Sequence, residues 1–159
     1  MIRKAVLPKI DPVPFTKEGF EKIQAEQKQL FIDRVDAIEH LKKSRELGDL
    51  KENGYYQASR QKVNAIDARL RRIKFLLKYG VVASASQTDI VEIGSFIELL
   101  SGKEKFTYQI VGGEESNPSQ GKISHKSPLG RLLMGKKIGE KIELHAPAGV
   151  IVYNLLRIF

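Results

Sequence analysis

Two long segments without proline, joined by only a few residues, constrain this chain more than any other feature. The first begins at Thr16, a suitable helix N-cap, and runs to Leu47 with helically spaced apolar residues. The second follows a stricter heptad rhythm and ends at Gly80, where a C′ glycine is expected. Because so short a connection makes two helices antiparallel neighbours, we predict a hairpin about 45 Å long. The predicted interface positions are Phe20, Ile23, Leu30, Phe31, Val35, Ile38 and Leu41 in the first helix and Tyr56, Ser59, Val63, Ile66, Leu70, Ile73 and Leu77 in the second.

The connection, Gly48-Asp49-Leu50-Lys51-Glu52-Asn53, places two carboxylates at the tip of the hairpin. One interpretation is local: Gly48 ends the first helix, Asp49 caps the second, and Glu52 completes a capping box. The other is chemical, because carboxylates three residues apart at a helix start can face the same side. Mg²⁺ is commonly held by one or two carboxylates together with waters and a partner's ligands. Two acids would therefore complete a site that another macromolecule half supplies, and such a metal can activate water for phosphodiester hydrolysis.

Beyond the second helix the apolar period changes from helical to strand-like. Residues 81–89 are small and almost uncharged and are predicted to be a linker, whereas the proline-containing residues 1–15 are predicted to be an N-terminal extension. A short helix is expected from Ser127 as N-cap, with Pro128 as its first residue. We predict an α+β protein, with the hairpin over 16–80 and its tip at 48–53, then a small antiparallel sheet domain with one short helix over 90–159. The strands are expected at Ile90–Ile93, Phe96–Leu100, Phe106–Ile110, Ile138–Leu144 and Val150–Phe159.

The charge of the chain is strongly basic and uneven. Residues 1–80 hold 18 Lys and Arg against 11 Asp and Glu, a net charge of +7 out of +8 for all 159 residues. Such an excess favours an anionic partner, nucleic acid being the usual one. A solvated helix face is the ordinary alternative for the basic residues of the second helix. The candidate residues that face nucleic acid are Arg60, Lys62, Arg69, Arg71, Arg72 and Lys74.

The absence of cysteine excludes disulfides, thiolate metal sites and a cysteine nucleophile. The apolar runs are too short to span a membrane, and no secretory signal precedes Pro8, so we expect a cytoplasmic protein without a membrane partner.

The tip hexapeptide, followed by Tyr56, resembles that of the bacterial Gre transcript-cleavage factors. So does Ser127-Pro128-Leu129-Gly130-Arg131-Leu132-Leu133-Met134-Gly135, with Gln109-Ile110-Val111-Gly112 before it and Pro147-Ala148-Gly149 after it. The resemblance covers about residues 15–159, in order. It implies a coiled-coil hairpin and an FKBP-like C-terminal domain that docks at the secondary channel of RNA polymerase. In the family the hairpin enters this channel, where its tip acids help to hold a catalytic Mg²⁺, and the polymerase then cleaves the 3′ end of backtracked nascent RNA.

Carried over, the resemblance makes Asp49 and Glu52 the catalytic, metal-directed pair, which binds Mg²⁺ jointly with the polymerase. Gly48, Asn53 and Tyr56 would support the tip. The residues implied in polymerase docking are Ser127, Pro128 and Arg131. The chain would then be a monomeric factor that stimulates the polymerase and is not itself an enzyme.

Two residues depart from the family pattern. The family often has a small residue and then an acid after Asn53, whereas this chain has Gly54 and Tyr55. A regulator that occupies the channel without stimulating cleavage therefore remains an alternative. A coiled-coil protein that binds RNA by itself, with a steep dependence on salt, is a third hypothesis.

Overall fold

The computed structural model describes residues 11–47, 53–83, 89–147 and 149–159. Contacts divide the chain into two compact units. One is the helical unit Phe20–Tyr79; the other, called here the globular unit, joins Met1–Gly19 to Gly80–Phe159. Within the described residues, no helix is long and apolar enough to cross a membrane.

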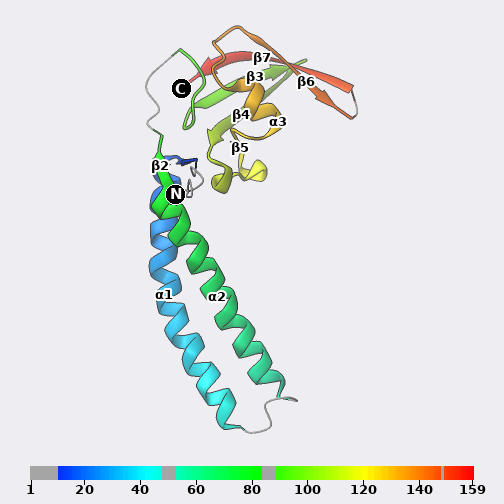
Figure 1. Ribbon diagram of the computed structural model, residues 1–159. Coiled ribbons are helices and arrows are strands. Elements are labelled where there is room, and N and C mark those ends of the chain that lie inside the picture. Colours follow the sequence, from blue (N-terminus) through cyan, green and yellow to red (C-terminus); the bar gives the residue numbers. More distant parts are fainter. Residues whose placement is uncertain (1–10, 48–52, 84–88, 148) are drawn as a thin grey trace, which may run out of the picture. The chain divides into compact units, whose positions relative to one another are not determined.

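The predicted hairpin helices are α1 (Lys17–Glu46) and α2 (Gly54–Tyr79), which are coloured blue to green in Figure 1. The interface of α2 follows the predicted heptads: Ser59, Ile66 and Ile73, seven residues apart, are buried. A side chain at every seventh position returns to the same face of the helix, so these three lie on one stripe.

The interface of α1 differs from the prediction. Phe31 and Val35, expected at the interface, are 56% and 66% exposed. The buried α1 stripe instead contains small and polar side chains, which a search for large apolar residues overlooks. Its heptad positions are Ile23, Leu30, Ala37 and Ser44, of which Leu30 is half-buried and the others are buried. Phe31 and Val35 lie off this stripe and consequently remain exposed.

The globular unit is built on a five-stranded sheet of order β5-β4-β3-β7-β6. Neighbouring strands are antiparallel, as predicted, except that β5 adds a parallel edge strand beside β4. The bounds are β3 Phe96–Ser101, β4 Glu104–Val111, β5 Lys122–Ser124, β6 Lys141–Ala146 and β7 Gly149–Ile158. One core packs between this sheet and α3 (Pro128–Leu133) and contains Val91, Ile97, Leu99, Ile110, Leu133, Ile142 and Leu155.

Several expected loop and strand positions differ in detail. No strand forms at Ile90–Ile93, where only an isolated bridge joins Ile90 to Lys137. Ile138, expected in a strand, lies outside β6 and is 54% exposed. The polar segment before β5 contains two 3₁₀ turns, η1 (Gly113–Glu115) and η2 (Pro118–Gln120). The bounds of these strands and turns depend on hydrogen bonds to neighbouring segments. The residue pattern of one segment does not specify such bonds.

The chain enters and leaves the hairpin through a pair of short parallel strands. β1 (Val13–Phe15) pairs with β2 (Gly80–Val82), and the side chain of Phe15 is fully buried. Residues expected in the extension and the linker therefore form strands here. Gly80 follows α2 as predicted but begins β2 directly, without the left-handed conformation of a C′ glycine.

Candidate functional site

The end of the hairpin is organised by Asn53. Its Oδ1 accepts hydrogen bonds from the backbone N–H groups of Tyr55 (3.0 Å) and Tyr56 (3.2 Å), so Asn53 is the N-cap of α2. The prediction that Asp49 caps this helix, with Glu52 in its first turn, is wrong, because Gly54 is its first residue. Asparagine caps as well as aspartate, and its amide group supplies a donor that a carboxylate lacks.

That donor joins the two helices. Asn53 Nδ2 donates to the backbone carbonyl of Ser44 in α1 (3.1 Å), and Ser44 is fully buried. Beside this contact, the guanidinium of Arg45 lies 5.9 Å from the centre of the Tyr56 ring, within cation–π range. Asn53 and Tyr56, two of the three residues predicted to support the tip, thus contact the end of α1. The third, Gly48, lies outside the described residues, as do Asp49 and Glu52.

Tyr55, which stands where the family often has an acid, makes a contact that the sequence did not predict. Its hydroxyl lies 2.9 Å from Nδ1 of His40 in α1, and the two rings meet nearly at right angles. The pair borders a shallow cavity of about 210 Å³. The lining residues are Ala37, His40, Tyr55, Ala58, Ser59 and Lys62. Tyr55 therefore links the start of α2 to α1 through its hydroxyl group.

The donor set for a metal is small. Among the described residues, no group of three or more His, Cys, Asp or Glu side chains is placed to hold a metal ion. The candidate ligands are the two carboxylates that lie in sequence between the end of α1 and the cap of α2. Carboxylate oxygens suit Mg²⁺, which needs near-octahedral coordination and retains several waters. Two carboxylates fit a shared site and are too few for a complete one.

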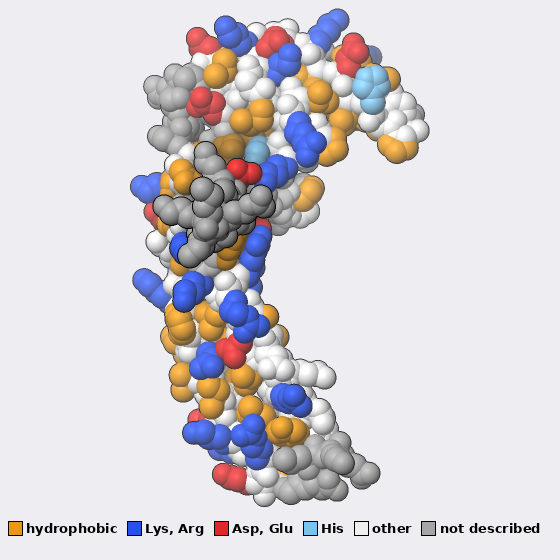
Figure 2. Space-filling model, in the orientation of Figure 1, with side chains coloured by type: hydrophobic (Ala, Val, Ile, Leu, Met, Phe, Trp, Pro, Cys, Tyr) orange, Lys and Arg blue, Asp and Glu red, His pale blue; other side chains and the backbone are white. Residues whose placement is uncertain are grey.

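The basic residues predicted to face nucleic acid lie on more than one side of α2. Arg60, Arg71 and Lys74 are separated by eleven and three residues, which places them on one side of the helix. Lys62 and Arg69 are seven residues apart and lie on the opposite side. Along the visible face of the hairpin, Figure 2 shows Lys and Arg side chains interspersed with hydrophobic ones. The basic residues therefore flank the helix pair and do not form one patch.

Two of these cations, Arg69 and Arg72, already have partners. Arg69 binds Glu26 of α1 through Nε (2.6 Å) and Nη2 (2.7 Å), and this bidentate hydrogen bonding holds the pKa of the Glu26 carboxyl below its ordinary value. The Arg72 guanidinium lies 5.4 Å from the centre of the Phe75 ring. Arg69 consequently serves the hairpin interface, whereas Arg60, Lys62, Arg71 and Lys74 are exposed.

The residues implied in docking meet at the start of α3. Ser127 is its N-cap, as predicted, accepting a hydrogen bond from the backbone N–H of Gly130 at 3.0 Å. Pro128 is the first helical residue, and Arg131 is exposed one turn on. Only glycine fits at position 130, since a Cβ there would lie 2.0 Å from the carbonyl oxygen of Ser124. The helix start is thus fixed against the last residue of β5.

Comparison with known proteins assigns both halves of the chain. The profile of the family described as "Transcription elongation factor, N-terminal" matches residues 13–82. The profile "Transcription elongation factor, GreA/GreB, C-term" matches residues 86–158. The chain belongs to the GreA/GreB family of transcription elongation factors. The resemblance inferred from the tip and from the Ser127–Gly135 segment is thereby confirmed.

Relatives within the GreA/GreB family cover nearly the whole chain. Transcription elongation factor GreA of Thermosipho africanus is 39% identical over 154 residues, which cover 94% of this chain and 98% of that protein. GreA of Nitratiruptor sp. is 39% identical over 150 residues, covering 92% of each. Among solved structures, GreA factor homolog 1 (Gfh1) of Thermus thermophilus is similar at 25% identity, covering 93% of this chain and 99% of that one, with a TM-score of 0.44.

Proposed function

We propose that this chain binds the secondary channel of RNA polymerase and stimulates cleavage of the 3′ end of backtracked nascent RNA. Membership of the GreA/GreB family and the long hairpin support the proposal. The observation that carries it is the capping of α2 by Asn53. Because Asn53 caps α2, the helix start does not need Asp49 or Glu52. The chain nevertheless has two acids in a connection of a few residues. A role for both as ligands of a shared metal ion explains their presence.

In this proposal the protein donates ligands to the active site of another enzyme. Asp49 and Glu52 supply carboxylate oxygens toward a Mg²⁺ held jointly with the polymerase, and the metal supplies the acidity that activates water. Asn53 and Tyr56 hold the adjoining helix ends together through Ser44 and Arg45. The chain binds the polymerase and orients the two carboxylates, and the polymerase cleaves the phosphodiester bond of the RNA.

Docking falls to the globular unit in this proposal. The start of α3 presents Ser127, Pro128 and Arg131 on a helix fixed by its cap and by Gly130. A rigid element loses little conformational entropy on binding, so it is a suitable contact for the rim of the channel. The protein acts as a monomer, with one hairpin entering one channel.

Tyr55 favours a second candidate function, a regulator that occupies the channel without stimulating cleavage. Tyr55 binds His40 and stands where the family often has a carboxylate. The tip of this chain is therefore less negative than a tip with three acids. Binding to polymerase without release of RNA fragments would be its signature.

The test is cleavage of labelled RNA in halted, backtracked polymerase complexes. We would compare wild type, Asp49→Asn and Glu52→Gln with the control Asp36→Asn, which neutralises an exposed carboxylate on α1. Circular dichroism would check that each variant folds. We expect wild type and the control to stimulate cleavage and both tip variants to lose it. Equal cleavage by all four proteins would refute the proposed role of the acids, and binding without cleavage by wild type would identify the regulator.

RNA binding without polymerase separates the third hypothesis. A gel shift of single-stranded RNA by the protein alone, weakening steeply as salt rises, would indicate a free-standing RNA binder. We expect no such shift at physiological salt, because the exposed cations of α2 are divided between two sides of the helix and Arg69 is bound to Glu26.

A further inference from the structure

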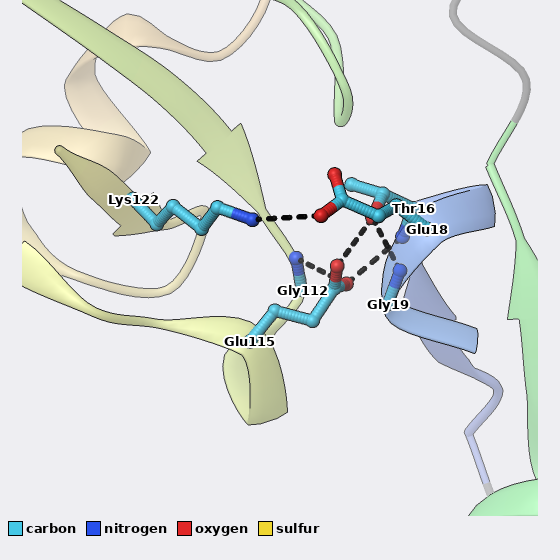
Figure 3. Close-up of polar contacts among 6 residues, drawn as sticks. All are labelled: Thr16, Glu18, Gly19, Gly112, Glu115 and Lys122. Atoms are coloured by element: carbon cyan, nitrogen blue, oxygen red, sulfur yellow. Dashed lines mark hydrogen bonds and ion pairs between the residues drawn. The ribbon is translucent and has the colours of Figure 1, made fainter. Parts of the chain in front are cut away.

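A carboxylate of the globular unit binds the start of α1. Glu115, the last residue of η1, accepts hydrogen bonds from the backbone N–H and the side-chain hydroxyl of Thr16; the first of these is 2.8 Å long. The same carboxylate accepts a bond from the backbone N–H of Gly112 at 3.3 Å. Figure 3 shows Glu115 reaching from its turn to the first residues of the helix. The contact joins residues 99 positions apart in sequence.

Thr16 transmits this contact to the helix. Its hydroxyl oxygen accepts a hydrogen bond from the backbone N–H of Gly19 at 3.0 Å, which makes it the N-cap predicted from the sequence. The hydroxyl proton is donated to Glu115, so the carboxylate fixes the orientation of the cap. Thr16 is only 6% exposed. A negative charge beside a helix N-terminus is also favourable for the helix dipole.

Glycine at two positions allows the chain segments to come this close. A Cβ on Gly19 would lie 1.9 Å from Glu115 Oε1, and a Cβ on Gly112 would lie 2.1 Å from the carbonyl oxygen of Pro14. A weaker ion pair, 3.6 Å between Lys122 Nζ and Glu18 Oε1, lies beside them. The contact is therefore a closely fitted one that involves backbone on both sides.

We propose that Glu115 is a positioning residue for the cleavage reaction, which it serves by fixing the first turn of α1 to the globular unit. This inference rests on the function proposed above. Because α1 is one uninterrupted helix from Lys17 to Glu46, constraint of its first turn is passed along its length. A helix of this length spans about 45 Å. A rotation of about 1° at its base moves its far end by about 0.8 Å.

Small displacements of this kind matter for catalysis. A misplacement of about 1 Å can lower a rate by about 100-fold. Loss of the Glu115 contact should consequently lower the cleavage rate when every polymerase has a factor bound. It should change the factor concentration that gives half the maximal rate much less, since Ser127, Pro128 and Arg131 are untouched.

The first experiment measures cleavage against factor concentration for Glu115→Ala, Thr16→Val and Thr16→Ser. Valine removes the hydroxyl of Thr16 at nearly constant shape, and serine retains it. Glu143→Gln, at an exposed position of β6, is the matched control for loss of a carboxylate. We expect a fall of about 10-fold or more in the saturating rate for Glu115→Ala and Thr16→Val. Thr16→Ser and Glu143→Gln should match wild type.

A second experiment tests the contact between Glu115 and Thr16 without polymerase. The chain has no cysteine, so Gln61→Cys in α2 and Glu104→Cys in β4 provide two unique spin-labelling sites. Electron paramagnetic resonance should give a broader distribution of distances between the labels in Glu115→Ala than in the labelled protein that retains Glu115. Thermal melts identify variants that fail to fold. If Glu115→Ala is one of them, the comparison of Thr16→Val with Thr16→Ser tests the inference.

The outcomes separate the two proposals. A wild-type protein that stimulates no cleavage refutes the proposed function. The label distances would still test whether the contact between Glu115 and Thr16 fixes the first turn of α1. A folded Glu115→Ala with the saturating rate and the label distances of wild type overturns the inference. A raised half-saturating concentration at an unchanged saturating rate also overturns it, because that result assigns Glu115 to docking.

Discussion

Replacing Asn53 by alanine removes three hydrogen bonds at the start of α2. Two of them cap the helix through Tyr55 and Tyr56, and loss of an asparagine N-cap costs about 1 kcal/mol. The third is the 3.1 Å bond to the carbonyl oxygen of Ser44, and a net hydrogen bond contributes about 1 kcal/mol. The free energy of unfolding of the hairpin should therefore fall by about 2 kcal/mol. Asn53→Asp keeps the cap and loses only the donor, so half of this loss is expected.

The assay is urea unfolding of the full chain, followed by circular dichroism at 222 nm, where helices dominate the signal. Gln61→Ala, an exposed substitution two turns into α2, is the control and should leave the midpoint nearly unchanged. The expected order of stability is wild type, Asn53→Asp, Asn53→Ala. A midpoint for Asn53→Ala equal to that of wild type would refute the assignment of Asn53 as cap. Asn53→Asp less stable than Asn53→Ala would show that the capping contribution had been misjudged.

Three further predictions concern other parts of the molecule. Ser127→Ala removes the cap that accepts from Gly130 and should lower the unfolding free energy of the globular unit by about 1 kcal/mol, measured in urea by the near-ultraviolet dichroism of its tyrosines. Glu26→Gln should destabilise the hairpin at pH 7 by less than 1 kcal/mol, because the pair with Arg69 is partly exposed. Since folding lowers the pKa of Glu26, its contribution is complete above the ordinary glutamate pKa and disappears as the pH falls through the lowered value; a difference from wild type that persists in acid would contradict this. Tyr55→Glu restores an acid beside the tip and should raise the rate of RNA cleavage in backtracked complexes, whereas an unchanged or lower rate would show that Tyr55 does not limit it.

The helical half of the fold was predictable where large apolar residues occupy the interface. The heptads of α2 are confirmed by the burial of Ser59, Ile66 and Ile73. In α1 the interface runs through Ala37 and Ser44, whose small side chains carry little hydrophobic signal. A prediction from the spacing of large residues therefore placed Phe31 and Val35 in the helix interface, whereas both are exposed. Small residues in an interface therefore make the pattern harder to recognise.

The tip was predictable in composition and not in its hydrogen bonds. Asp49 and Asn53 are both good caps, and the sequence alone cannot choose between them. The choice depends on the carbonyl of Ser44, which only the paired helix brings within reach. Glu115 gave no signal at all, because its partner is 99 residues away and contacts of that range follow from the tertiary fold. The family motifs, by contrast, needed no geometry to be identified.

The pairing of β1 with β2 makes the hairpin a closed insertion. Phe15 lies in register with Val82, so the chain returns to the place it left after an excursion of more than sixty residues. Removing seven residues from each helix at matching heptads would keep the buried stripes, the caps and this register. Each such step would shorten the hairpin by about 10 Å and leave the globular unit as it is. The length of the hairpin can therefore change in steps of one heptad without redesign of the globular unit.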